Sequence, residues 1–556
     1  MSTAKDAGEC VNPFAEPDAV ATLDALAQTN RFEALGRAAD ALMRRHPQDR
    51  RVVLRRALAS AAAGRGAEAR EAFMRARTLA PALASCHALV GAALTRLGVL
   101  QGAFAELKEA LRLDPRSAPA LSAMGSLQQR LGDDDIALQC FERAAALAPT
   151  SAEMQMLLAL ALQRAGRIAA CQAAGRRAAA LGGDSGAVVG AQAHLLAETG
   201  AVEEALTLLE RRRRAAPDDT LINRQYAALR LQLRASAAAS FQAAEREDAV
   251  WRDLEASAAR TDDAGQMLRA AIAWVLQDRW SQARRVMATA LAAAIPEQAA
   301  ALRRADPKAA AFLLGYHGFI TALLADQPGE SVEEEALGAA PILHFGDSHC
   351  LTYAHRVVRL RDTAVMVRPR LCLGAKAHHL ALKGPTQAKA VLQRLLETAP
   401  RDAAGSLDAA ALWFSFGEID CRQSEGILAH HRKSGAPLDR IVRDTVEGYV
   451  GWLAQALEEA LDQPPGASPA PWPPVYLFGA PAPIRAAESS GADHAARLDV
   501  IRRFNQALSQ AAEAAGFRMI DLWRVTIGPD GEAEAAAFCD GVHLRPATAS
   551  AIEAQL

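Results

Sequence analysis

Residues 98–132 read GVLQGAFAELKEALRLDPRSAPALSAMGSLQQRLG, and this stretch decides the fold of the first half of the chain. It runs from one glycine to the next over 34 residues, with Pro115 midway between them. Glycine adopts positive φ at the lowest cost, so Gly98 and Gly132 are predicted to lie in turns. Proline interrupts a helix, so Pro115 is predicted to separate two helices. The stretch therefore corresponds to one unit of a helical repeat.

The 34-residue spacing recurs along the chain in three series that keep a constant register. The first series has helix-stopping residues, the second has turn residues, and the third has small residues five positions after each turn glycine. Their members are Pro47, Pro81, Pro115, Pro149, Gly183 and Pro217; Asn30, Gly64, Gly98, Gly132, Gly166 and Gly200; and Ala69, Ala103, Ala137, Cys171 and Ala205. A fixed period of this length indicates a solenoid of helical hairpins.

These three series resemble the tetratricopeptide repeat (TPR), and the resemblance covers residues 18–219. Phe73 and Phe141 stand at the large apolar position of the second helix of a repeat. The resemblance implies an all-α superhelix whose concave face binds a protein or peptide partner.

Residues 220–325 are predicted to extend the solenoid with degenerate units. Residues 278–280 would form the turn of one such unit. A helix over 306–324 would close the solenoid through large apolar residues, which are Phe312, Leu313, Tyr316 and Phe319.

Arginine recurs two residues before the turn glycine, at Arg96, Arg130 and Arg164. One interpretation is that these cations complement the dipole at the carboxyl end of a helix. The alternative is an arginine ladder on the concave face that binds an acidic or phosphorylated partner. Both interpretations remain open from the sequence.

The composition is that of a folded globular chain, with 51% hydrophobic and 23% charged residues among 556. Acidic and basic residues number 64 and 62, so we expect neither nucleic acid nor an anionic membrane as a partner. Residues 1–17 are predicted to be disordered and lack the features of a secretory signal, and no apolar run is long enough to span a bilayer. We therefore expect a cytoplasmic protein whose eight scattered cysteines are reduced thiols, with no metal site and no cofactor.

The pattern changes after residues 326–340, which combine proline, glycine and acidic residues and are predicted to be a linker. Short apolar runs then alternate with helical patterns. The runs are 342–345, 364–367, 410–416, 475–478 and 517–522. This alternation predicts a three-layer α/β domain with a parallel sheet over residues 341–556.

Two motifs at opposite ends of this domain carry residue types suited to acyl transfer. Ser348 follows the first apolar run, and a helix is predicted over 350–360, so its hydroxyl is expected at the carboxyl edge of the sheet and its amide at a helix N-terminus. Asp540 and His543 lie near the C-terminus at a spacing that lets the carboxylate orient the imidazole. Ser348, His543 and Asp540 can act as nucleophile, general base and orienting acid.

The domain resembles an SGNH (GDSL-type) hydrolase, a flavodoxin-like three-layer fold. Gly346-Asp347-Ser348-His349 matches the first block with His349 in place of the usual leucine, and D-x-x-H at 540–543 matches the last. Gly374 is placed like the second-block glycine, and the resemblance implies that its amide and that of Ser348 belong to the oxyanion hole.

Residues 417–420, Gly-Glu-Ile-Asp, stand where the family has G-x-N-D. Ile419 replaces an asparagine that donates to the oxyanion, and the loss of one such donor costs about 10²- to 10³-fold in rate. Arg422 is a candidate to supply the missing donor; alternatively, Arg422 and Glu418 pair with each other and only shape the loop. Neighbouring polar residues are candidates to line the pocket, namely Asp347, His349, Glu418 and Asp420.

Together these patterns predict an ester hydrolase joined to a TPR platform that binds a protein partner or substrate. The substrate would be an acylated sugar or a small ester. Transfer of the acyl group to a sugar hydroxyl by the same triad is one alternative. A catalytically inactive binding module with a TPR scaffold is the other.

Overall fold

The computed structural model describes residues 17–28, 32–62, 66–79, 84–96, 98–165, 167–181, 186–232, 241–261, 263–288, 295, 298–300, 307–326, 339–401, 407–423, 426–460, 473–485 and 490–556. The chain forms two compact units, one of residues 1–195, 207–225 and 293–312 and one of residues 196–206, 226–292 and 313–556. Several predictions concern residues outside the described ones: residues 1–16 of the disordered terminus, residues 327–338 of the linker, and Asn30, Gly64, Pro81, Gly166 and Gly183.

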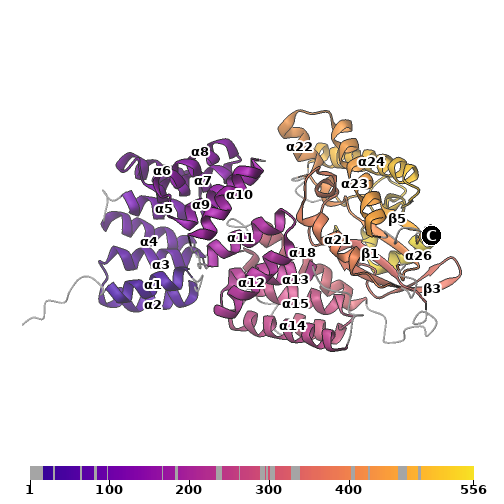
Figure 1. Ribbon diagram of the computed structural model, residues 1–556, viewed down its shortest axis with the longest axis horizontal. Helices are drawn as coiled ribbons and strands as arrows, with labels where there is room; N and C mark the ends of the chain where they lie inside the picture. The colour runs from indigo at the N-terminus through magenta and orange to yellow at the C-terminus, as the bar shows by residue number, and fades with distance from the viewer. Residues whose placement is uncertain are drawn as a thin grey trace, which may run out of the picture. The chain divides into compact units, whose positions relative to one another are not determined.

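Antiparallel helical hairpins follow one another through the first half of the chain (Figure 1). The helices are α1 (Pro17–Gln28), α2 (Phe32–Arg45), α3 (Arg50–Ala62), α4 (Gly66–Leu79), α5 (Ala84–Arg96), α6 (Leu100–Leu113), α7 (Ala118–Leu131), α8 (Asp134–Leu147), α9 (Ala152–Arg164), α10 (Ile168–Ala180), α11 (Gly186–Glu198), α12 (Val202–Ala215) and α13 (Thr220–Gln232). The prediction of tandem helical repeats is confirmed.

The described turn and crossing residues have the predicted conformations. Gly98, Gly132 and Gly200 have φ values of 72°, 87° and 91°, in the left-handed region that favours glycine. The small residues of the third series are completely buried: Ala69, Ala103, Ala137, Cys171 and Ala205. Helices therefore cross closely where the sequence provides no large side chain.

Packing within a hairpin repeats with the same period. Phe73, Leu107 and Phe141 are spaced by 34 residues and are all buried in the cores of the hairpins. A methyl group added at Gly125 of α7 would lie 2.9 Å from Cζ of Phe141 in α8. The hydroxyl of Ser117 accepts a hydrogen bond from the amide of Ala120, which caps α7.

The helices after α13 are α14 (Phe241–Thr261), α15 (Ala264–Leu276), α16 (Trp280–Val286) and α18 (Pro307–Ala325). Asp278 lies in the turn between α15 and α16 with φ of 62°, at the predicted turn of the degenerate unit. Residues 226–292, which hold α14 to α16, belong to the same compact unit as the sheet. The boundary between the two units therefore does not lie at the predicted linker, residues 326–340.

The second unit contains a six-stranded sheet in the order β2-β3-β1-β4-β5-β6. The strands are β1 (Ile342–Gly346), β2 (Val357–Leu360), β3 (Thr363–Leu371), β4 (Ala411–Ser415), β5 (Val475–Phe478) and β6 (Arg518–Ile520). Five of them are parallel, and β2 pairs with β3 in antiparallel register.

The helix predicted over 350–360 was wrong. The 3-10 helix η2 (Ser348–Leu351) is a single short turn, and the chain reverses at His355, which has φ of 57°. Val357 to Leu360 then pair with residues 363–366, because a tight turn at 361–362 brings this segment alongside β3 as an edge strand. Ser348 therefore opens a single 3-10 turn and not a long helix.

Both faces of the central strands are buried. Ile342, Trp413 and Phe478 share one face with residues of the C-terminal segment, including Leu544 and Ile552. The intervening residues of these strands point to the opposite face and are also buried. The remaining helices of this unit are α20 (Ala377–Ala381), α21 (Gln387–Glu397), α22 (Ile427–Ser434), α23 (Leu438–Ala460), α24 (Gly491–Ala514), α25 (Leu522–Thr526) and α26 (Ala549–Glu553), with short 3-10 turns η3 (Ile419–Cys421), η4 (Ala535–Ala537) and η5 (Pro546–Thr548) (Figure 1).

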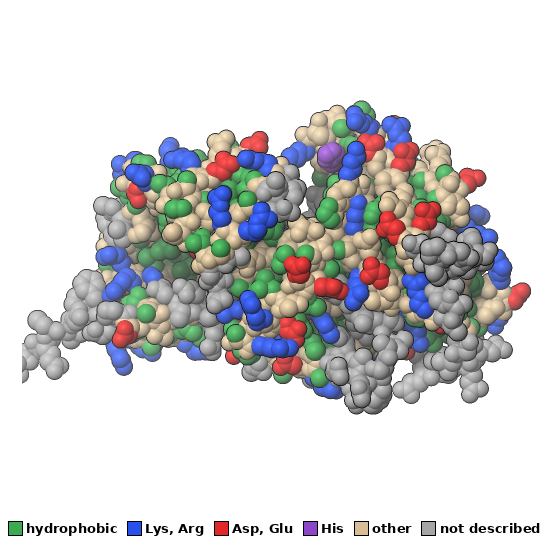
Figure 2. All heavy atoms as spheres, viewed as in Figure 1, with side chains coloured by type: hydrophobic (Ala, Val, Ile, Leu, Met, Phe, Trp, Pro, Cys, Tyr) green, Lys and Arg blue, Asp and Glu red, His purple; other side chains and the backbone are tan. Residues whose placement is uncertain are grey.

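Within the described residues, no helix has both the length and the apolar character needed to cross a membrane. Basic and acidic side chains are interspersed on the face seen in Figure 2, as the near-equal numbers of the two charges lead us to expect.

Candidate active site

The loops that follow three neighbouring parallel strands meet at one edge of the sheet. Gly346 ends β1 in register with Leu371 of β3 and Ser415 of β4. The amide of Cys372 donates to the carbonyl of Gly346 at 2.6 Å, which ties the loop after β3 to the end of β1. Ser348 follows β1 at this carboxyl edge, where ligands bind in open α/β folds.

The structure brings the three predicted catalytic residues together. Nε2 of His543 lies 2.8 Å from Oγ of Ser348, across 195 residues of sequence. Nδ1 of the same ring lies 2.6 Å from Oδ2 of Asp540. These two distances make a continuous hydrogen-bonded chain from a hydroxyl through an imidazole to a carboxylate.

Asp540 is held by its own loop. Its Oδ1 accepts hydrogen bonds from the amides of Val542 at 3.0 Å and His543 at 2.8 Å. Burial would raise the pKa of Asp540, but the hydrogen bond and the charge of His543 lower it below its usual value. The carboxylate is therefore ionised at neutral pH and fixes the orientation of the ring.

His543 is buried, with 5% of its surface exposed. Burial lowers the pKa of His543 below its usual value, while the hydrogen bond with Asp540 acts in the opposite direction. The imidazole is consequently neutral at pH 7, which is the state that a general base requires.

Two residues that sequence reasoning assigned to solenoid packing lie at this site. Phe319 of α18 stacks on the ring of His543, with centroids 4.0 Å apart and an interplanar angle of 9°. The ring of Tyr316, one turn earlier, has its centroid 6.1 Å from that of His543. No local signal places a helix of residues 307–325 against residue 543, because the two are more than 200 residues apart.

A buried polar cluster adjoins Ser348. Burial would lower the pKa of His349, but the charges of Asp347 and Glu418 raise it above its usual value. Nε2 of His349 lies 3.7 Å from Oε2 of Glu418, and the centroids of His349 and His543 are 5.2 Å apart. Oδ1 of Asp347 accepts a hydrogen bond from the amide of His349 at 2.9 Å, and burial raises the pKa of Asp347.

Arg422, a candidate oxyanion donor, directs two guanidinium nitrogens at Glu418. Its Nε and Nη2 donate to Oε2 of Glu418 at 2.9 and 2.7 Å. Nη2 of Arg497 donates to Oε1 of Glu418 at 3.1 Å. Arg422 and Glu418 thus pair with each other, which was the alternative interpretation of the sequence. Donation from Arg422 to an oxyanion stays a prediction.

The other predicted site residues lie in the loops after β3 and β4. Gly374 comes three residues after β3 with φ of 68°, and its role in an oxyanion hole stays a prediction. The carboxylate of Asp420 accepts hydrogen bonds from the amides of Ala377 at 2.8 Å and His378 at 3.0 Å. Burial raises the pKa of Asp420 to about 6. Asp420 thus joins the loop after β4 to the beginning of α20.

The arginine series lies at the carboxyl ends of helices α5, α7 and α9. Arg130 and Arg164 are exposed in the last turns of α7 and α9, and the side chain of Arg96 is outside the described residues. Nε of Arg164 lies 3.3 Å from Oδ1 of Asp134 in the preceding hairpin. A role for this series in binding a partner stays a prediction.

No cluster of three or more histidine, cysteine or acidic side chains suited to a metal ion occurs in the part of the chain that the structure describes.

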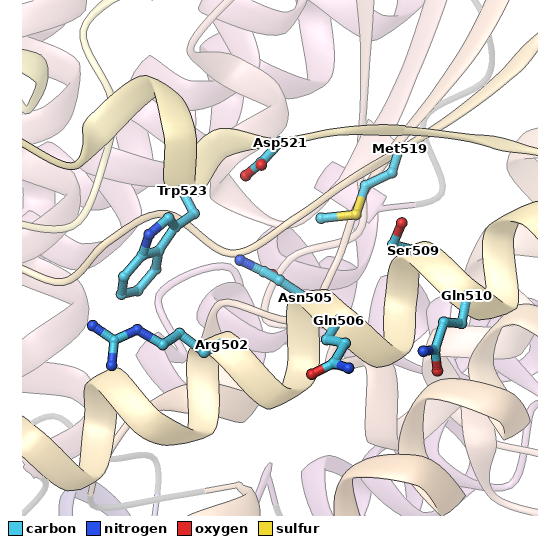
Figure 3. A pocket seen from close by; sticks show the side chains of 8 residues that line it. All are labelled: Arg502, Asn505, Gln506, Ser509, Gln510, Met519, Asp521 and Trp523. Carbon is cyan, nitrogen blue, oxygen red and sulfur yellow. The ribbon is translucent and has the colours of Figure 1, made fainter.

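An open hollow of about 490 Å³ lies beside α24 and the segment after β6 (Figure 3). Arg502 lies over the ring of Trp523 there, 5.2 Å from its centroid, and Asn505 exchanges hydrogen bonds of 2.8 Å with the backbone of Ala480. None of the predicted catalytic residues lines this hollow.

No protein-family model and no curated protein matches the sequence. Solved structures match at low similarity. A crystal structure of MamA is 18% identical over 30% of this chain and 95% of that chain, with a TM-score of 0.23. The Cut9-Hcn1 hetero-tetramer of the APC/C is 17% identical over 38% of this chain and 42% of that chain, with a TM-score of 0.30. The human IFIT1 dimer with m7Gppp-AAAA is 16% identical over 55% of this chain and 76% of that chain, with a TM-score of 0.33. Matches with TM-scores this low carry no argument about the function of this chain.

Proposed function

We propose that the α/β part of the chain is a serine ester hydrolase of the SGNH type and that the helical hairpins are a TPR platform for a protein partner or substrate. The observation that carries the catalytic part is the hydrogen-bonded chain from Ser348 through His543 to Asp540. The order and distances suit a nucleophile, its base and an orienting carboxylate.

The reaction proceeds by acyl transfer through Ser348. Oγ attacks the ester carbonyl carbon while its proton moves to Nε2 of His543, and the π electron pair of the carbonyl moves to its oxygen. When that pair returns, the bond to the alcohol oxygen breaks and the alcohol leaves with the proton from His543. A water molecule, deprotonated by the same imidazole, then attacks the acyl-enzyme. The bond between the acyl carbon and Oγ breaks, His543 returns the proton to Oγ of Ser348, and the carboxylic acid leaves.

Burial of Ser348 and His543 favours a second candidate, transfer of the acyl group to a sugar hydroxyl. Only 5% of the surface of each of Ser348 and His543 is exposed. A site closed to bulk water protects an acyl-enzyme from hydrolysis. A bound sugar hydroxyl would then replace water in the second step, with the same base.

The test is labelling of the full chain with a fluorophosphonate probe, which forms a phosphonyl ester only with an activated serine. We expect labelling of the wild type and complete loss in Ser348→Ala and His543→Ala, because one variant lacks the nucleophile and the other lacks its base. Product analysis with an acetyl ester, with and without added sugars, then separates hydrolysis from transfer. A folded wild type that is not labelled would instead indicate an inactive binding module.

A further inference from the structure

Helix α18 faces all three residues of the triad, although it lies outside the part of the sequence that resembles a hydrolase. Phe319 covers the ring of His543. A methyl group added at Gly318 would lie 3.9 Å from Cβ of Asp540. The ring of Tyr316 has its centroid 6.1 Å from that of His543, and its phenol and the hydroxyl of Ser348 are hydrogen-bonding neighbours. One turn of this helix therefore lies beside the nucleophile, the base and the orienting acid.

The position of α18 is fixed by its own packing. Leu313, Phe319, Ile320 and Leu323 are buried, with at most 2% of their surfaces exposed. These residues recur at the spacing of one helical face, so Tyr316 is presented toward the same side. A phenol on a helix that packs through a buried face is directed without the mobility of a loop residue.

The oxyanion hole needs a donor that Ile419 cannot provide, since its side chain has no polar atom. During attack, the carbonyl oxygen that becomes the oxyanion is bonded to the same carbon as Oγ of Ser348. A group that reaches Oγ in the free enzyme is therefore close to that oxygen in the tetrahedral intermediate. Tyrosine hydroxyls serve as such donors in enzymes.

We propose that Tyr316 is a catalytic residue that donates a hydrogen bond to the oxyanion, in place of the side chain replaced by Ile419; this inference rests on the proposed function. The phenol gives no proton away; it stabilises the electron pair that moves from the carbonyl π bond to oxygen. Burial raises the pKa of Tyr316, and the charge of Asp347 raises it further, so the phenol keeps the proton that it must share.

The test compares Tyr316→Phe with the wild type in the full chain, using p-nitrophenyl acetate and the fluorophosphonate probe. We expect kcat to fall by about 10²-fold with KM within about twofold, since a donor used only in the transition state does not affect binding of the ground state. Labelling of Ser348 should slow in parallel. Ile419→Asn in the Tyr316→Phe background should recover part of the rate, because it restores an amide donor.

The matched control is Tyr476→Phe, which removes another buried phenol hydroxyl, one that donates to the carbonyl of Leu556 at 3.2 Å. Its kcat should equal that of the wild type. An unchanged or increased kcat in Tyr316→Phe, or a loss expressed in KM alone, would overturn the assignment while Ser348 remains labelled. A wild type that neither hydrolyses the ester nor reacts with the probe would refute the proposed function itself.

Discussion

Glu418 is the residue that organises the charges beside the nucleophile. It is 7% exposed and accepts hydrogen bonds from Arg422 and Arg497. Burial would raise the pKa of Glu418, but the charges of Arg422 and His349 hold it well below its usual range. A buried carboxylate with several cationic partners remains ionised, and removal of one partner would leave an uncompensated charge. Together with Asp347, Glu418 thus raises the pKa of His349, which lies next to the catalytic imidazole.

The charge of His349 affects the pH dependence of the proposed reaction. The general base His543 acts when neutral, so kcat/KM should rise with pH through its pKa, which lies below the usual value, and reach a plateau near pH 7. The positive charge of His349 lowers the pKa of His543. In His349→Gln that charge is absent, protonation of His543 becomes easier, and the acidic limb should move to higher pH.

The measurement is the pH profile of kcat/KM for p-nitrophenyl acetate in both proteins. His431→Gln is the control, because Nδ1 of His431 in α22 contacts the carbonyl of Ala436 just after that helix, 2.7 Å away. Its profile should match that of the wild type. An acidic limb that moves to lower pH in His349→Gln would contradict the assignment of charge to His349.

At the scale of elements, the helical hairpins depend on glycine where two helices cross. Gly125 of α7 faces the ring of Phe141, which is 1% exposed and cannot easily move. Gly125→Ala should destabilise the repeats by about 1–3 kcal/mol, because the added methyl group overpacks the crossing. Urea unfolding followed by circular dichroism measures this change.

Gly102→Ala is the matched comparison within α6. A methyl group at Gly102 would be 3.4 Å from its nearest neighbours, an ordinary contact. The higher helix propensity of alanine should then stabilise the repeats by about 1 kcal/mol. Equal effects of the two substitutions would show that the crossing does not limit the size of residue 125.

The elements that could be predicted from sequence are those whose signals are local. Turn glycines such as Gly132 and crossing alanines such as Ala103 recur with the period, because each hairpin repeats the same geometry. Strand β2 was missed because four residues at an edge carry little periodicity, and only pairing with β3 makes them a strand. The approach of Ser348 to His543 was predicted from two sequence motifs and a family resemblance, while Tyr316 and Phe319 carry no motif that links them to the site.

At the scale of the whole molecule, the sheet and helices α14 to α16 belong to one compact unit. Nε2 of His355 lies 2.9 Å from the carbonyl oxygen of Val275. Asp278 lies 3.7 Å from both Arg368 and His355, and the ring of Trp280 meets that of His355 edge-on. The β2–β3 hairpin is therefore supported by a turn that the sequence assigns to the helical extension.

A pair of truncations tests this division. Removal of residues 1–181 takes away five hairpins but retains every segment of the second unit, so hydrolysis of p-nitrophenyl acetate should continue at nearly the full rate. Removal of residues 1–300 also deletes α14 to α16, so we expect lower thermal stability and lower activity. Equal activity of the two truncated chains would mean that the sheet does not need these helices.

Among the described helices of the first half of the chain, the most extensive contacts lie within a hairpin and between successive hairpins. In a repeat array of this kind each unit is held mainly by its neighbours in the chain. A pulling force applied to the ends of this segment should therefore release the hairpins one after another, each adding at most about 120 Å of contour length for its 34 residues. The plot of force against extension would show a regular series of small steps, so this segment would lengthen gradually under load.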